Sequence, residues 1–78
     1  MPDVTMSAEQ WLDAFASRVG VAAPSQEERE AILSLAGVAA HASERSAAPI
    51  ACWIAARAQM GAMDARDLAR ELSVAPLE

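Results

Sequence analysis

Alanine occupies 20 of the 78 positions of this chain, and this richness constrains the fold more than any other feature. Alanine has the highest helix propensity of all residues, so the chain is predicted to be all-α. Each alanine buries little apolar area, however, and a chain of this length depends on its few larger side chains to form a core. The expected core residues are Trp11, Phe15, Ile32, Leu35, Ile50, Trp53, Ile54 and Leu68.

Two segments carry strong helix-start signals. Ser7–Gln10 and Ser25–Glu28 both place a Ser three residues before Gln or Glu, which is the form of a capping box. The first helix is predicted to end at Gly20, because glycine adopts the left-handed cap conformation without strain. The second helix is predicted over 26–42, and it is apolar on nearly every side at 36–40. A helix that is apolar all round is expected at the centre of a fold.

Proline marks the third helix. Pro49 is tolerated only in the first turn of a helix, so the third helix is predicted to open near it and to end at Met60-Gly61. Asp64 is then predicted to cap a short fourth helix that turns Leu68 and Leu72 inward.

Short connections between these four helices predict the architecture. Sequential helices joined by few residues become antiparallel neighbours, so we expect a compact antiparallel four-helix bundle with helices two and three central. Residues 1–78 are predicted to form a single helical domain, with 1–6 and 73–78 as frayed tails. Because the core is small, a homodimer that adds buried area is a natural further expectation.

The charge pattern argues against several classes of partner. The formal net charge is −5, and all six basic residues are Arg. An acidic chain without a basic stripe is not expected to bind nucleic acid or an anionic membrane surface. The apolar runs are short and interrupted by His41 or Arg57, so no transmembrane segment is predicted. No signal peptide pattern is visible and the single Cys excludes an internal disulfide, so a cytoplasmic protein is expected.

Four polar residues gather at the turn between the second and third helices: His41, Glu44, Arg45 and Ser46. One interpretation is a cradle for an anionic ligand, in which the first N–H groups of a helix opening near Ala47 and the guanidinium of Arg45 bind phosphate or carboxylate. The other is a structural lock, in which Ser46 caps the third helix, Glu44 and Arg45 pair with neighbouring helices, and His41 bonds a carbonyl. Neutralisation of Arg45 by a carboxylate would exclude the cradle.

Catalytic and metal chemistry are weakly indicated. His41 and Cys52 flank one turn, and an imidazole can activate a thiol. A Cys among Ala, Ile and Trp is more often a small buried hydrophobe. His41 and Glu44 supply only two of the three or four ligands that a metal needs. We therefore predict no catalytic residue, no metal ligand and no cofactor.

Two further features concern the third helix and its end. Arg57 lies within an alanine-rich segment and is expected to pair with Glu30 or Glu44. Met60 and Met63 flank Gly61 and form a soft corner that can adapt to a protein partner.

The block LAGVAAHASERSAAPIACW at 35–53, together with Trp11, Phe15 and the acidic residues after Ser25, resembles a small actinobacterial helical domain of unknown function. The resemblance covers roughly residues 8–72. It implies a domain that occurs alone, or beside or fused to nucleotidyltransferases of the molybdenum-cofactor guanylyltransferase type. The implied context is molybdopterin-guanine dinucleotide synthesis in the cytoplasm.

The chain itself lacks the parts of such an enzyme. A guanylyltransferase needs a Rossmann-like sheet, a Gly-rich nucleotide loop and a magnesium-binding Asp, and this sequence has no strand pattern and three widely spaced glycines. The hypothesis is therefore a non-enzymatic accessory or protein-interaction module whose partner is a molybdenum-cofactor nucleotidyltransferase. The alternative is a small-molecule binding domain that holds an anionic ligand at the 41–46 turn.

Overall fold

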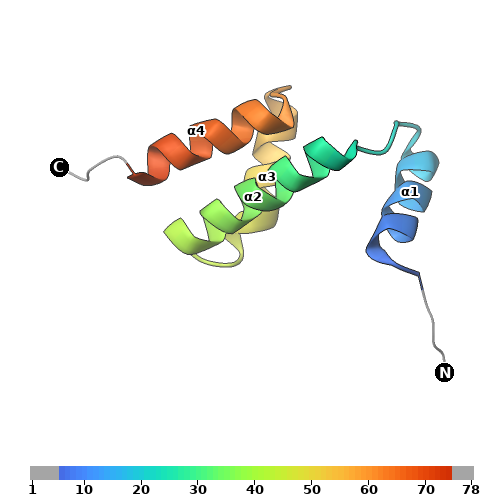
Figure 1. Ribbon diagram of the computed structural model, residues 1–78, viewed down its shortest axis with the longest axis horizontal. Coiled ribbons are helices and arrows are strands. Elements are labelled where there is room, and N and C mark those ends of the chain that lie inside the picture. The colour runs from blue at the N-terminus through green and yellow to red at the C-terminus, as the bar shows by residue number, and fades with distance from the viewer. Residues whose placement is uncertain (1–5, 75–78) are drawn as a thin grey trace.

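The computed structural model describes residues 6–74, which form four helices: α1 (Ala8–Val19), α2 (Gln26–Ala42), α3 (Ala47–Arg57) and α4 (Ala62–Val74). The four helices and their order along the chain are shown in Figure 1. Across 6–74 there is no strand, and none of the helices has the length and apolar character needed to cross a bilayer. The predicted all-α, four-helix fold is confirmed. The segments predicted to fray are 1–6 and 73–78, of which residues 1–5 and 75–78 lie outside the described residues.

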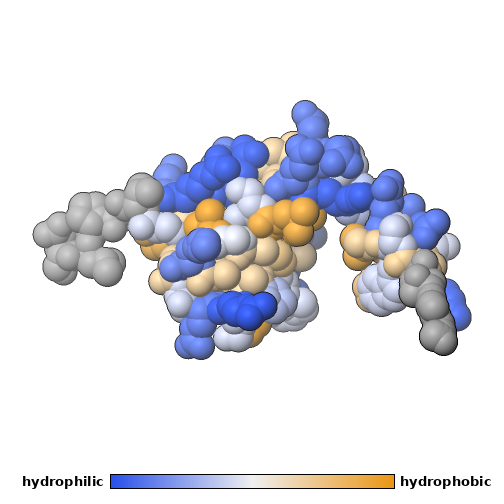
Figure 2. Space-filling view, turned by 60° about the horizontal axis from the view of Figure 1, so that its bottom comes forward, coloured by the Kyte–Doolittle hydropathy of each residue, from blue (hydrophilic) through white to orange (hydrophobic). Residues whose placement is uncertain are grey.

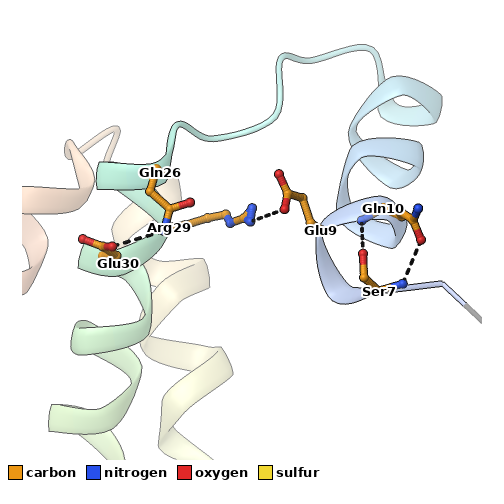
Figure 3. Close-up of polar contacts among 6 residues, drawn as sticks. All are labelled: Ser7, Glu9, Gln10, Gln26, Arg29 and Glu30. Carbon is orange, nitrogen blue, oxygen red and sulfur yellow. Dashed lines mark hydrogen bonds and ion pairs between the residues drawn. The ribbon is translucent and has the colours of Figure 1, made fainter.

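Both predicted capping boxes are present. Ser7 Oγ accepts the Gln10 N–H at 3.1 Å, and Gln10 Oε1 accepts the Ser7 N–H at 3.0 Å (Figure 3). Ser25 and Glu28 repeat the arrangement at 3.1 and 2.9 Å. α1 ends at Gly20, whose φ of 93° is left-handed. The bounds of α1 and α2 follow from these local signals, as the sequence predicts.

α3 differs from its prediction at its far end. It begins two residues before Pro49, which therefore lies in the first turn as expected. It ends at Arg57 rather than at Met60-Gly61. Gln59 takes a left-handed φ of 60°, which breaks the helix and turns the chain toward α4.

α4 is longer than predicted at both ends. It begins at Ala62, so Asp64 is not its cap; the carboxylate lies in the first turn, where it favours the helix dipole. The helix continues through Ser73 to Val74, so these two residues are not part of a tail. Ser73 Oγ donates a hydrogen bond to the Ala69 carbonyl at 2.9 Å and supports this last turn.

α2 is the centre of the packing, and both α3 and α4 lie against it. The buried residues at these contacts are Ala31 and Leu35 of α2 and Ala65 of α4. The small side chains of Ala31 and Ala65 let the axes of α2 and α4 approach closely. At one edge Arg70 Nη2 of α4 donates to Ser34 Oγ of α2 at 3.0 Å. We call α2, α3 and α4 together the helical body.

Most of the expected core residues lie at the surface. Only Leu35 is buried and Ile32 half-buried. α3 shows why: its half-buried residues are Ala47, Ala48, Ala51, Cys52 and Ala55, so it packs with its small side chains and turns its large ones outward. The expected core residues that the structure exposes are Trp11, Phe15, Ile50, Trp53, Ile54 and Leu68.

α1 lies apart from the helical body (Figure 1). It is joined to α2 by the connector at 20–25 and by an ion pair between Glu9 Oε1 and Arg29 Nη2 at 3.7 Å (Figure 3). Among the described helices, α3 and α4 are the ones that pack extensively against α2.

Two glycines offer a matched test of the helix assignments. A Cβ added at Gly37, inside α2, meets nothing within 4 Å, and Gly37 has no left-handed φ. Gly37→Ala should therefore raise the free energy of unfolding by about 0.5–1 kcal/mol. Gly20→Ala also meets open space, but its φ of 93° penalises any side chain, so this variant should lower stability. Urea denaturation of both variants measures the difference, and equal effects would contradict the assignment.

Candidate functional site

The 41–46 turn is open to solvent. His41, Glu44, Arg45 and Ser46 are all exposed, and across 6–74 no side-chain hydrogen bond or ion pair involves any of them. Ser46 occupies the N-cap position of α3 without making a side-chain cap bond, so its predicted capping role is wrong. The structure therefore does not hold these four side chains together through mutual contacts.

The backbone N–H groups that the anion cradle requires are already hydrogen-bonded to carbonyl oxygens of the preceding turn. The Ala47 N–H bonds the Glu44 carbonyl at 2.9 Å, and the Ala48 N–H bonds the Arg45 carbonyl at 3.1 Å. Pro49 follows and has no N–H. Arg45 itself pairs with no carboxylate within the described segment, so its guanidinium is available. Anion binding at this turn would depend on side chains, Arg45 foremost.

An apolar groove lies at the other end of α2. It encloses about 510 Å³ between the 21–24 connector, the first half of α2, the end of α3 and the start of α4. Its walls are mainly apolar and combine several alanines with the larger side chains of Ile32, Leu35 and Met60. Glu28 is the charged residue in its lining. We call this feature the apolar groove.

Cys52 lines the apolar groove and is half-buried there. Burial raises the pKa of its thiol, because the thiolate loses hydration in apolar surroundings. A catalytic thiol needs the opposite shift. His41 is exposed at the end of α2, is absent from the groove lining and makes no hydrogen bond to Cys52. Cys52 is thus a small apolar packing residue.

Arg57 does not form the ion pair expected from the sequence. It is exposed, and its guanidinium carbon lies 5.0 Å from the centre of the Trp53 ring, in a cation–π contact. Glu30 instead accepts a hydrogen bond from Gln26 Nε2 at 3.1 Å (Figure 3). Across 6–74, no three His, Cys, Asp or Glu side chains group closely enough to hold a metal ion.

Two groups of large apolar side chains are exposed, one on α3 and one on α1. The α3 face consists of Ile50, Trp53 and Ile54, which are 57%, 60% and 56% exposed. The α1 face consists of Trp11, Phe15 and Val19, which are 53%, 54% and 59% exposed. Hydrophobic spacing in the sequence marks such residues as needing cover, but it cannot say whether the cover comes from the same chain.

The described helices form a small all-α domain with exposed apolar surface on α1 and α3. The chain belongs to the family described as Domain of unknown function (DUF6457), whose model matches residues 3–76. No curated protein and no solved structure is significantly similar to it.

The raised pKa of Cys52 gives a direct chemical test. Iodoacetamide should alkylate Cys52 with a pH midpoint higher than that of a cysteine in an unfolded peptide, because only the thiolate reacts. The matched control is Ser46→Cys in a Cys52→Ala background, which puts the thiol at an exposed position. A Cys52 midpoint below that of the control would indicate an activated thiol and contradict the packing role.

Proposed function

We propose that this chain is a non-enzymatic protein-interaction module and that the α3 face binds its protein partner. The supporting observation is the orientation of α3. Its alanines and Cys52 are half-buried, while Ile50, Trp53 and Ile54 are more than half exposed. Exposed apolar surface grouped on one helix is typical of a protein contact, since it has no stabilising role in the isolated chain.

The residue types of the α3 face also favour a protein contact. Trp and Arg are enriched among the residues that dominate binding energy at interfaces. Arg57 lies over the Trp53 ring at 5.0 Å, so both side chains are partly ordered before binding. A partner of matching chemistry offers an apolar recess for Trp53 and a carboxylate or carbonyl for Arg57.

The proposed partner comes from the sequence resemblance. The block at 35–53 that carries the resemblance includes the first seven residues of α3, among them Ile50 and Trp53. The resemblance implies a nucleotidyltransferase of the molybdenum-cofactor guanylyltransferase type. In that role the domain is a cytoplasmic accessory in molybdopterin-guanine dinucleotide synthesis and does not transfer the nucleotide itself.

Binding of a purified guanylyltransferase of this type to the whole chain tests the proposal. Saturable binding is expected in calorimetry, and Trp53→Ala and Ile54→Ala should each raise the Kd at least about tenfold, which is about 1.4 kcal/mol. Leu72→Ala, at an exposed apolar position on α4, is the matched control and should leave the Kd unchanged. Absence of saturable binding contradicts the partner. If Leu72→Ala weakens binding as much as Trp53→Ala does, the α3 face is not the binding surface.

Availability of Arg45 favours a second function, the binding of a small anionic ligand at the 41–46 turn. Because the Ala47 and Ala48 N–H groups are occupied, we expect only millimolar affinity for inorganic phosphate, about 4 kcal/mol. In an NMR titration with phosphate, the amide shifts should be confined to the turn and lost in Arg45→Ala. Arg66→Ala, whose guanidinium pairs with Asp67, should leave the shifts unchanged. Shifts unaffected by Arg45→Ala would contradict this function.

A further inference from the structure

We propose that two copies of this chain form a symmetric dimer by exchanging α1, with each α1 face docked in the apolar groove of the other copy. This inference uses surfaces separate from the α3 face. It therefore stands or falls independently of the proposed partner.

α1 needs a cover that its own chain does not supply. It has 12 residues, a length at which an isolated helix is marginal in water and depends on packing of its apolar side. Trp11 and Phe15 stack on each other with ring centres 5.1 Å apart, and both are more than half exposed. Figure 2 shows α1 as a separate lobe with hydrophobic residues on the side toward the helical body.

The apolar groove matches the α1 face in shape and charge. Its largely apolar walls and volume of about 510 Å³ can receive large aromatic side chains, as holes receive knobs in helix packing. Glu28, whose carboxylate accepts the Ser25 N–H, is the acidic residue of the groove lining. On α1, Arg18 lines the same shallow hollow as Trp11 and Phe15, so it presents a positive charge beside the aromatic rings. The two surfaces are thus apolar with opposite charges.

No residue of the chain's own α1 lines the groove. The Gly20 and Val21 N–H groups both bond the Ala16 carbonyl, at 2.9 and 3.0 Å, which fixes how the chain leaves α1. Val21 and Pro24 already form part of the groove wall. The ion pair between Glu9 and Arg29, at 3.7 Å, also joins α1 to α2 in this arrangement. A second copy can supply an α1 that approaches the groove freely.

Both surfaces of the proposed exchange are open in a single copy. Trp11, Phe15 and Val19 of the α1 face are each more than half exposed, and no residue of α1 lines the groove. Because each copy offers both an α1 face and a groove, a two-fold exchange satisfies both sites and closes the assembly.

Crosslinking to Cys52, the one cysteine of the chain, tests the exchange directly. Ala14 lies in the hollow with Trp11 and Phe15, so Ala14→Cys and a short bismaleimide should give a covalent species of twice 8.2 kDa. Asp13→Cys, on the polar side of α1, is the matched control and should give little product. Ala14→Cys with Cys52→Ala should give none. A crosslink within one chain, or equal yields from the two positions on α1, would overturn the proposal.

Charge reversal supplies a second measurement that separates exchange between copies from folding back within one copy. R18E and E28R should each shift sedimentation equilibrium toward the monomer by at least about tenfold in Kd. An equimolar mixture of the two variants should restore the dimer, because each α1 then meets a groove of opposite charge. Circular dichroism checks that E28R, which loses a capping bond, stays helical. A mixture that stays monomeric overturns the exchange, while a monomer that still binds guanylyltransferase through Trp53 leaves the proposed function intact.

Discussion

The contact of alanine surfaces with α2 is the constraint on which the rest of the structure depends. Ala31 of α2 and Ala65 of α4 are buried, and α3 meets α2 with its own small side chains. Close approach of helix axes provides dispersion contacts but removes little apolar area from water. The large apolar residues are left outside this contact, and their exposure links the fold of this chain to its association with other proteins.

Local chemistry made the first half of the fold predictable. Ser7 and Ser25 each form a reciprocal cap with a residue three positions on, and Gly20 takes the left-handed conformation that ends α1. These interactions involve neighbours in sequence, so residue identity alone indicates them. The start of α4 is harder to predict, because an Asp is common both at the N-cap and in the first turn of a helix, and Asp64 fits either position. The end of α3 depends on a left-handed Gln59, a conformation that no glycine signals.

The candidate sites were predicted less completely, for a different physical reason. His41 lies in the last turn of α2, and Glu44, Arg45 and Ser46 lie in the connection to α3. Their exposure and lack of mutual bonds are tertiary properties, as is the rotation of α3 about its axis. That rotation also decides that Trp53 lies outside rather than in a core. Periodicity locates the apolar side of a helix, whereas the identity of the surface that covers it is a tertiary or quaternary property.

Gln59 has a consequence for the apolar groove. A non-glycine residue with φ of 60° carries conformational strain of about 1–3 kcal/mol. Met60 and Gly61, the next two residues, belong to the groove wall. One wall of the groove is therefore positioned by the backbone conformation of a single residue that does not itself line it.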